Sequence, residues 1–406
     1  MKFLRNFMDK LAPTFEEGGK LSKFYPIYEL IDSILYTSSD VTKNASHIRD
    51  GLDLKRMMTV VIIGLQPALL MAAYNTGLQA NTAIEAIGQN PEGWRASFLM
   101  WMGLGFDSSS MMDNFFHGFM YFLPVIIVTN LVGGFWEVLF AIIKKHEINE
   151  GFLVTGMIFP LILPPTIPLW QVAVGISFGV VIGKEIFGGT GMNIFNPALI
   201  ARAFLFFNFP AAMSGNEVWT TVDGFSGATP LGVIADTGLA TLDVTWLDAF
   251  YGFIPGSMGE TSTLAILLGA GILVFSRIGS WQIMVSIFTI AGITAFLLNL
   301  VPIDPEAADP NLMMSLPPEW HFVLGGLAFG AVFMATDPVS AAMTAKGKWI
   351  YGSLIGFMVI MIRVINPAFP EGMMLAILFG NAFAPVIDNF IVRANIKRRK
   401  ARYGTA

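Results

Sequence analysis

Long apolar stretches separated by short polar segments alternate along most of the chain. Before residue 57 apolar and charged positions are mixed, and after residue 392 the sequence is basic. Between these limits the apolar stretches approach the roughly 20 residues that a helix needs to cross a bilayer, although several are short or interrupted by Pro-Pro, Gly-Gly or Asn-Pro. The pattern predicts ten membrane-spanning helices, at about residues 57–76, 115–143, 152–165, 169–187, 194–210, 262–276, 282–301, 319–336, 349–365 and 372–392.

The composition agrees with a membrane protein. Of the 406 residues, 54% are hydrophobic and 13% are charged, and the mean hydropathy is +0.63. Soluble domains carry about 25% charged residues. The chain has no cysteine, which excludes disulfides, thiolate-held iron–sulfur clusters and flavin attachment through sulfur. Any iron–sulfur chemistry must therefore belong to a partner protein, and no nucleic-acid partner is expected.

The distribution of charge predicts the orientation of the chain. Short loops that stay in the cytoplasm carry an excess of Lys and Arg. Residues 1–56 and 393–406 are rich in both, whereas the loop at 211–261 contains neither. We therefore expect both termini in the cytoplasm and the 211–261 loop in the periplasm. Residues 21–35 are expected either to lie on the membrane surface or against a partner, or to be a partly ordered tail.

A weak internal repeat divides the expected helices into two groups of five. Because five is odd, the two groups must cross the membrane in opposite directions, as in transporters built from inverted repeats. The analogous fold is that of five-plus-five transporters such as the urea transporters. The repeated motifs are Gly156-x-x-Phe159 with Thr166-x-Pro168, matched by Gly326-x-x-Phe329 with Thr336-x-Pro338, and Asn193-x-Phe195-x-Pro197, matched by Asn381-x-Phe383-x-Pro385.

These patterns predict an all-α polytopic membrane protein made of two inverted five-helix repeats. A mixed N-terminal extension precedes the repeats, a polar loop joins them, and a basic tail follows. The predicted segments are the cytoplasmic extension at 1–56, the first repeat at 57–210, the periplasmic loop at 211–261, the second repeat at 262–392 and the cytoplasmic tail at 393–406.

The joining loop contains a glycine-rich and hydroxyl-rich stretch, Asp-Gly-Phe-Ser-Gly-Ala-Thr-Pro-Leu-Gly, at 223–232. Ser226-Gly227 favours a turn, and Pro230 biases Thr229 toward an extended conformation that presents its hydroxyl. Such a threonine is either part of a tight surface turn or an attachment point for a prosthetic group. The tetrapeptide Ser226-Gly227-Ala228-Thr229 matches the (S/T)-G-A-T flavinylation motif, in which FMN is joined through its phosphate to the threonine hydroxyl.

Three carboxylates lie in or beside the predicted spans: Glu137, Asp337 and Asp388. Carboxylates inside a membrane are costly, so they serve ions, protons or a pairing partner. Hard cations prefer oxygen ligands, and the break at Thr336-Asp-Pro338 would expose backbone carbonyls as well. The alternative is structural pairing, with Lys184, Arg363 or the inner-loop lysines Lys346 and Lys348 as partners.

Two features of the sequence suit the binding of a flat aromatic ring. Gly133-Gly134 permits close approach to the backbone, and the aromatic cluster at 202–209, which includes Phe204 and Phe206, suits stacking of a quinone or an isoalloxazine. Ordinary helix packing uses the same residue types and is the alternative. The sequence contains no P-loop, Rossmann fingerprint or metal-ligand cluster, and its four histidines are scattered.

Taken together, the ten spans, the SGAT loop, the Thr336-Asp-Pro338 break and the Gly133-Gly134 helix resemble one family along essentially the whole chain. It comprises the B subunits of the Na+-translocating NADH:quinone oxidoreductase and the D subunits of the related Rnf complex. The long extension at 1–56 favours the quinone-reducing branch. An Rnf-type D subunit of a ferredoxin:NAD oxidoreductase, and a passive channel or solute transporter of the same fold, are the alternatives.

The resemblance implies a subunit of the bacterial inner membrane that joins quinone reduction to Na+ export. Electrons would pass from NADH through FAD and iron–sulfur centres in partner subunits to FMN on a second flavinylated subunit. They would then reach FMN on Thr229, a non-covalent riboflavin, and ubiquinone. A periplasmic flavin transferase would attach the FMN, because nothing in this chain is suited to forming a phosphoester.

The resemblance also implies roles for individual residues. Riboflavin is expected near the broken helices, with Asn193 and Asn196 as its polar partners. The quinone pocket is expected at Gly133, Gly134, Phe204 and Phe206, and Na+ handling at Glu137, Asp337 and Asp388.

Overall fold

The computed structural model describes residues 2–15, 18–22, 25, 28, 32, 54–88, 91, 93–144, 151–222, 225, 227–302, 311–366 and 371–402. Predictions that concern other residues, among them Ser226 and most of the segment 21–35, lie outside this set. The described residues form helices, turns and loops, without a β-strand among them. The predicted all-α class is therefore confirmed.

Among the described residues, six helices are long and apolar enough to cross a membrane, and three shorter apolar helices accompany them. Each of the nine overlaps one of the predicted spans. The six long ones are α3 (Leu54–Ile87), α5 (Met111–Lys144), α7 (Leu169–Val181, continued by the 3₁₀ turn η2, Glu185–Phe187), α13 (Trp281–Asn299), α16 (Ala345–Ile365) and α17 (Met373–Arg402). The shorter ones are α6 (Gly151–Leu161), α8 (Pro197–Asn208) and α12 (Thr263–Phe275). The total of ten spans and the inverted repeat stay predictions.

The predicted span at 319–336 is wrong as one continuous helix. α14 (Pro318–Val323) ends at an extended residue, Leu324, and the chain resumes as α15 (Leu327–Phe329) and the π-helix η5 (Gly330–Met334). Between them Gly325 has a φ of +64°, which glycine adopts without strain. The Gly325-Gly326 pair thus interrupts an apolar stretch that composition alone presents as one helix.

Two other predicted boundaries are shifted. α3 continues well past residue 76 to Ile87, and α17 continues past residue 392 to Arg402. The basic tail is therefore not separate from the last predicted span over its described part. Its Lys, Arg and Ala residues are good helix formers, and cations are favourable at a helix C-terminus.

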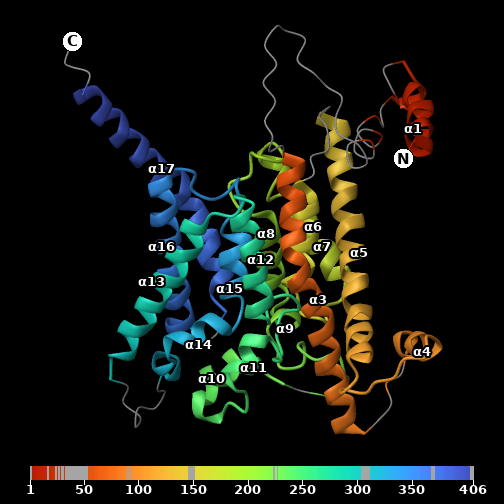
Figure 1. The fold of residues 1–406 in the computed structure, drawn as a ribbon, viewed down its shortest axis with the longest axis vertical. Helices are drawn as coiled ribbons and strands as arrows, with labels where there is room; N and C mark the ends of the chain where they lie inside the picture. The colour runs from red at the N-terminus through yellow and green to blue at the C-terminus, as the bar shows by residue number, and fades with distance from the viewer. Residues whose placement is uncertain are drawn as a thin grey trace.

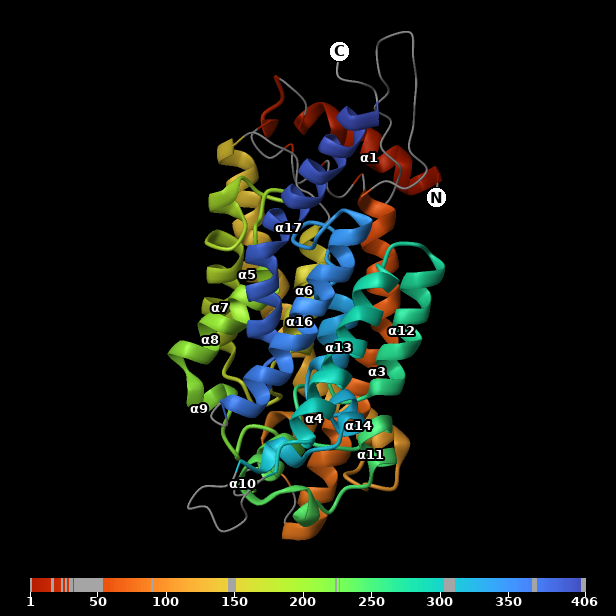
Figure 2. The ribbon, with the colours of Figure 1, turned by 90° about the vertical axis from the view of Figure 1, so that its left-hand side faces the viewer.

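The long helices run side by side along one axis (Figure 1). α1 (Lys2–Phe15) and the C-terminal part of α17 lie at one end of this bundle, and most of the short helices lie toward the other end (Figures 1 and 2). The short elements are α4 (Trp94–Trp101), α9 (Pro210–Met213), α10 (Pro230–Thr237), η3 (Leu239–Thr241), α11 (Trp246–Tyr251) and η4 (Leu312–Ser315). The ends that carry α1 and α10 are thus opposite, as the predicted orientation of the termini and of the joining loop requires.

Glycine allows the closest helix pairs to form. α3 packs along α5, and a Cβ atom at Gly118 would overlap the carbonyl oxygen of Ala73. α13 packs along α16, where a Cβ atom at Gly352 would overlap the hydroxyl of Ser286. Small residues at such contacts let helix backbones approach closely, which drives association in membranes.

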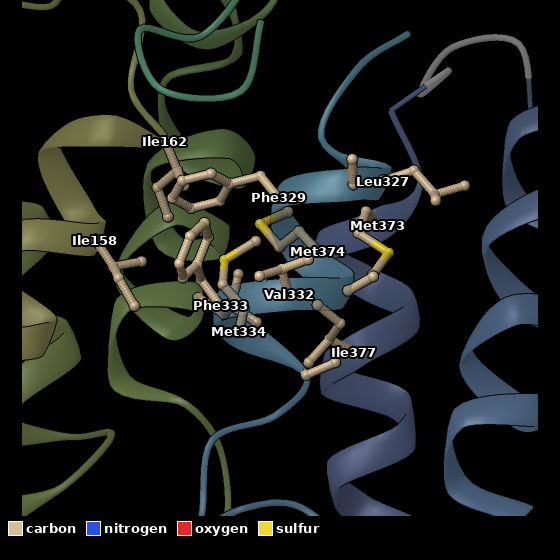
Figure 3. Packing of buried hydrophobic residues seen from close by; sticks show 14 of the residues in the cluster. Ile158, Ile162, Leu327, Phe329, Val332, Phe333, Met334, Met373, Met374 and Ile377 are labelled. Carbon is tan, nitrogen blue, oxygen red and sulfur yellow. The ribbon is translucent and has the colours of Figure 1, made fainter. Parts of the chain in front are cut away.

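The centre of the bundle is a buried apolar cluster, and the helices that precede the Thr166-x-Pro168 and Thr336-x-Pro338 motifs end in it (Figure 3). α6 ends at Leu161 and η5 ends at Met334, so both helices stop inside the protein. The fully buried ring of Phe329 and the buried ring of Phe333 lie between the α6 side and α17. Ile158 and Phe333 of this cluster also line a cavity next to the start of α3.

Candidate functional site

Thr229 is the N-cap residue of α10. Its φ of −65° and ψ of 153° are extended, its Oγ1 accepts a hydrogen bond from Gly232 N at 3.2 Å, and Pro230 is the first helical residue. The predicted extended conformation of this threonine is confirmed. Proline fixes the first helical φ, and the threonine side chain satisfies one of the otherwise unpaired amides of the first turn. Before it, Gly227 N donates to Asn216 O at 2.8 Å.

The half-buried Thr229 lies between two cavities. One has a volume of about 190 Å³ and is lined by Arg202, Phe206, Trp219, Ala228, Asp236 and Glu371, among others. The other has a volume of about 10 Å³, enough for about one water molecule, and is lined by Ser257, Glu260, Thr261 and Glu371, among others. Thr229 therefore lines two cavities whose linings also contain the charged residues Arg202, Glu260 and Glu371.

One arginine, Arg202, and two glutamates, Glu260 and Glu371, are the charged residues on one side of these cavities. Arg202 Nη1 lies 2.9 Å from Glu260 Oε1, and Arg202 Nη2 donates to Ser257 Oγ at 3.1 Å. Glu371 Oε2 accepts from Gly326 N at 3.0 Å. Buried charges are stable only when they are paired and hydrogen-bonded, and these contacts supply the partners.

The prediction that Arg363 neutralises an aspartate is wrong. The guanidinium is fully buried and donates to three backbone carbonyl groups, those of His321 at 2.8 Å, Leu324 at 2.9 Å and Glu371 at 3.1 Å. Arg363 thus holds the end of α14 and the start of α17 together. Such carbonyls are left without partners where helices break, which explains why a long cationic donor is placed here.

The residues around Thr229 fit an FMN joined through its phosphate. Arg202 supplies a cation in the same cavity, and Phe206 and Trp219 supply ring faces against which an isoalloxazine can stack. Asn216 supplies an amide at the same cavity. Of the predicted motif, Gly227, Ala228 and Thr229 lie here, and Ser226 lies outside the described residues.

A third cavity, of about 70 Å³, lies at the end of the bundle where α3 begins. Its polar lining consists of Thr155, Lys184, Thr190, Asn193, Asn196, Thr336 and Asp337. The structure therefore brings the two predicted riboflavin residues, Asn193 and Asn196, together with Asp337, which the sequence assigned to Na+. Asn196 also caps α8, and Asn193 Nδ2 donates to Phe195 O at 2.9 Å.

Lys184 is the cation of this third cavity. Its Nζ forms an ion pair with Glu137 Oε1, lies 3.9 Å from Glu185 Oε1 and donates to Thr190 Oγ1 at 3.1 Å. The side chains of Lys184, Glu137 and Glu185 are 6%, 5% and 1% exposed. On the far side of Glu185, Lys144 Nζ lies 3.1 Å from Oε2. The pairing role that the sequence left open for Glu137 is thus present.

Asp337 and Asp388, the two aspartates predicted to handle Na+, accept hydrogen bonds from the segment that follows η5. Asp337 Oδ2 accepts from Ser340 Oγ at 2.6 Å, and its Oδ1 accepts from Val339 N at 3.3 Å. Asp388, on α17, accepts from Met343 N at 2.7 Å and from the amide and hydroxyl of Thr344 at 3.1 and 2.6 Å. Among the described residues, no cluster of His, Cys, Asp and Glu side chains suits a metal ion. The Na+ assignments of Glu137, Asp337 and Asp388 stay predictions.

The four predicted quinone residues lie in different environments. A Cβ atom at Gly133 would overlap the ring of Phe152, whereas one at Gly134 would meet open space. Phe204 stacks on Phe178 with ring centroids 4.4 Å apart, and Phe206 lines the cavity of Thr229. Within the described cavities these four residues are not brought together, and their role in quinone binding stays a prediction.

Sequence reasoning missed Glu260, Glu371 and Trp219. Among the carboxylates it weighed only Glu137, Asp337 and Asp388, although Glu260 and Glu371 precede the predicted spans at 262–276 and 372–392. All three missed residues lie in connecting segments of the structure. A signal was present for Glu260, because it is the last acidic residue before a long uncharged span in a loop without Lys or Arg. Its partner Arg202 lies 58 residues earlier, a pairing that no local pattern reveals.

Comparisons with known proteins show the family to which the chain belongs. The family described as "NQR2, RnfD, RnfE family" matches residues 41–397. The chain is 56% identical over 408 residues to the B subunit of the Na(+)-translocating NADH-quinone reductase of Ectopseudomonas mendocina (strain ymp), and the match covers 98% of this chain and 99% of that protein. It is 55% identical over 405 residues to the corresponding protein of Chromohalobacter salexigens, covering 98% and 96% of the two chains, and 54% identical over 410 residues to that of Pseudomonas aeruginosa (strain LESB58), covering 99% and 100%. The family match and these full-length similarities show that the chain belongs to the NQR2, RnfD, RnfE family.

Proposed function

We propose that this chain is the membrane subunit of a Na+-translocating NADH:quinone reductase, and that it carries FMN covalently on Thr229. The observation that carries the proposal is the SGAT threonine itself. It caps α10 in an extended conformation and opens onto the 190 Å³ cavity that Arg202, Phe206 and Trp219 line. The reductase activity is taken from the names of relatives that match the chain from end to end.

At this site the chain's own residues bind and orient. FMN, when bound, supplies reversible one-electron and two-electron transfer. Thr229 would fix the phosphate end of the group at the start of α10, and Arg202, whose Nη1 is paired with Glu260, would be a cation in the lining of the same cavity. Phe206 and Trp219 would offer ring faces on which the isoalloxazine could stack.

A second, non-covalent flavin is proposed for the cavity at Asn193 and Asn196. The amides and hydroxyls that line it suit the ring edge and ribityl chain of riboflavin. The cavity of about 70 Å³ is smaller than a flavin, so flexible side chains at its edge, such as Met57 and Met58, have to move when the flavin binds. Electrons would pass from the Thr229 flavin to this one and on to ubiquinone, for which Gly133, Gly134, Phe204 and Phe206 remain the proposed contacts.

The proposed setting is the bacterial inner membrane, with both termini in the cytoplasm and Thr229 in the periplasm. The absence of cysteine means that iron–sulfur centres must be held elsewhere. The proposed partners are therefore iron–sulfur subunits, an NADH-oxidising subunit and a second subunit with covalent FMN. A periplasmic flavin transferase is proposed to attach the FMN. Na+ export is proposed to depend on Glu137, Asp337 and Asp388.

The alternatives are an Rnf-type D subunit and a channel or transporter of the same fold without redox chemistry. An assay for covalent flavin distinguishes the proposal from the second alternative, because a channel or transporter without redox chemistry needs no covalent flavin. The full-length chain is produced in a host that supplies the flavin transferase, denatured, separated on a gel and viewed under ultraviolet light. We expect fluorescence from the unaltered chain and its loss in Thr229→Ala.

A matched control keeps this assay specific. Thr237→Ala removes the same side chain at the other end of α10, where Thr237 is exposed, and should keep full fluorescence. Thr229→Ser keeps both a hydroxyl and an N-cap, so this variant should retain part or all of the flavin fluorescence. Persistence of the fluorescence in Thr229→Ala would refute the flavin assignment.

A further inference from the structure

The short helix α4 turns its largest side chains away from the protein. Trp94, Phe98 and Trp101 follow one another at spacings of four and three residues, so they lie on one face of the helix, and the ring centroids of Phe98 and Trp101 are 5.7 Å apart. These three side chains, here called the aromatic stripe, are 59%, 41% and 80% exposed. The buried residues of α4 are the smaller Ala96 and Leu99. A helix at a water-facing surface has the opposite arrangement, so the stripe requires a partly apolar environment outside the chain.

The position of α4 in the fold limits what that environment can be. α4 lies between α3 and α5 along the chain and packs against α5. Figure 1 shows it on the outer side of α5, toward the end of the bundle that carries α10. α3 and α5 have 34 residues each, which makes each of them about 50 Å long, whereas the hydrocarbon of a bilayer is about 30 Å thick. Even when it is tilted, α5 therefore extends beyond the hydrocarbon by about 10–20 Å.

The contacts of Arg95 give the level of α4 along α5. Its Cζ lies 4.5 Å from the ring centroid of Tyr121 and 4.8 Å from that of Trp94, and its Nε donates to Met120 O at 3.3 Å. Tyr121 follows Met111, the first residue of α5, by ten residues, which is about 15 Å along a helix. Because this length falls within the part of α5 that exceeds the hydrocarbon, α4 lies at the level of the lipid headgroups.

The composition of this connection suits a lipid surface. Arg95 is the only charged residue from 93 to 106, and the aromatic stripe contains two tryptophans, whose apolar ring and single N–H donor favour the membrane–water interface. Exposed apolar residues continue the surface along α5, with Met111 and Met112 at its start and Leu131 further on. Because α5 is one of the helices able to cross a membrane, its exposed apolar side is the side that faces lipid. The positive charge of Arg95 complements the phosphate groups of phospholipids.

We propose that α4 is an interfacial helix, which holds the aromatic stripe among the headgroups and the first acyl carbons of the bilayer. In such a helix the apolar face enters the boundary between headgroups and acyl chains. Arg95 then lies at the level of the phosphates. The hydroxyl of Tyr121, whose ring contacts Arg95, donates to Thr221 O at 3.3 Å, in the segment that leads to the SGAT motif. The bilayer contact of α4 is thus connected to the joining loop through one tyrosine, and it does not depend on a bound flavin.

The test uses the absence of cysteine, which leaves each introduced cysteine as the only labelling site. Phe98→Cys and, separately, Trp101→Cys are spin-labelled in the full-length chain, which is reconstituted into nanodiscs of phosphatidylethanolamine and phosphatidylglycerol. Collision rates with oxygen, which dissolves among acyl chains, and with a nickel chelate, which stays in water, report the depth of the label. We expect the ratio of oxygen to nickel collisions to be at least about tenfold higher at 98 and 101 than at Ser109→Cys, an exposed position in the polar part of the same connection. Ratios at 98 and 101 no higher than the ratio at 109 would place α4 in water and overturn the proposal.

A second measurement identifies what covers the aromatic stripe when the chain is assembled with its partners. The photoreactive amino acid p-benzoylphenylalanine replaces Trp101 and, as the control, Ser109, and native membranes that contain the complex are irradiated. At 101 we expect the chain to gain the mass of a phospholipid, and at 109 we expect no lipid adduct. A crosslink at 101 mainly to another subunit would show that the stripe is a protein interface and would overturn the lipid assignment, whatever the spin labels report for the chain alone.

Discussion

Arg202 Nη1 lies 2.9 Å from Glu260 Oε1, and this buried ion pair joins α8 to the segment that precedes α12. The two side chains are 8% and 3% exposed. A Cβ atom at Gly326 would overlap the Glu260 carboxylate, so the glycine after the α14 break is needed for the glutamate to fit. The Arg202–Glu260 ion pair thereby connects three chain segments: α8, the segment before α12 and the segment after α14.

The first prediction concerns the stability of this pair. Arg202→Leu leaves Glu260 buried without its cation and should lower the free energy of unfolding by about 3–5 kcal/mol. The double variant Arg202→Met with Glu260→Leu removes both charges and should be more stable than Arg202→Leu alone. Thermal unfolding in detergent, with size-exclusion chromatography to detect the folded protein that remains, measures the stability of the single and the double variant. A double variant no more stable than Arg202→Leu would show that the pair does not act as a unit.

The second prediction uses neighbouring glycines to separate packing from quinone binding. A Cβ atom at Gly134 meets open space, so Gly134→Ala should change stability by less than about 0.5 kcal/mol. If Gly134 contacts the quinone, the same variant should raise the KM for ubiquinone while the complex stays assembled. A KM equal to that of the unaltered complex would remove Gly134 from the quinone site.

Gly118→Ala is the packing counterpart of that variant. Its new Cβ atom would overlap the carbonyl oxygen of Ala73, between α3 and α5. Because two helix backbones have to separate, we expect a loss of about 1–3 kcal/mol of stability without a specific change in the KM for quinone. Thermal unfolding and quinone-reduction kinetics on the same preparations distinguish the two glycine variants.

Local chemistry explains what the sequence could predict. The all-α class followed from apolar stretches of membrane length, and the extended Thr229 followed from the proline after it. The break within 319–336 was missed because a Gly-Gly pair is ordinary in membrane helices, and only the φ of Gly325 shows that the helix stops there. The continuation of α17 to Arg402 was missed because a change from apolar to basic residues marks the end of a membrane span and not the end of a helix.

The sites depend on contacts that no local pattern contains. Arg202 and Glu260 are 58 residues apart, and Asn193 and Asp337 line one cavity although they lie in different halves of the chain. Spacing within a segment constrains side chains only over a few residues. The sequence therefore predicted which residues carry chemistry, and the fold determines which of them act at one place.

The third prediction concerns the loop before α5. Ser109 donates to Asp107 Oδ1 through both its amide, at 2.8 Å, and its hydroxyl, at 2.6 Å, and these hydrogen bonds lower the pKa of Asp107. A carboxylate whose pKa is lowered on folding stabilises the loop above its ordinary pKa of about 3.9 and loses that effect as the pH falls through the folded value. Hydrogen exchange of the Ser109 amide should therefore accelerate on acidification below about pH 4, after correction for intrinsic exchange. In Asp107→Ala this extra acceleration should be absent.

The last prediction concerns Asp337 and Na+. Its carboxylate lines the cavity that also contains Lys184, and it accepts hydrogen bonds from Ser340 Oγ and Val339 N. Among the described residues, these hydrogen bonds stay within its own turn, and neither Lys346 nor Lys348 forms an ion pair with it. Asparagine can keep the contacts to the turn but removes the charge. If Asp337 handles Na+, Asp337→Asn should assemble with both flavins and require more Na+ for half-maximal quinone reduction.

Ser340→Ala is the matched control, because it removes the shortest hydrogen bond of Asp337, at 2.6 Å, but keeps the charge. It should lower stability by about 1 kcal/mol and leave the Na+ dependence close to that of the unaltered complex. Quinone reduction titrated with Na+, together with thermal unfolding of the same preparations, provides both readouts. If Asp337→Asn destabilises the complex while its Na+ dependence is unchanged, Asp337 only holds the break after η5, and Na+ has to be handled elsewhere.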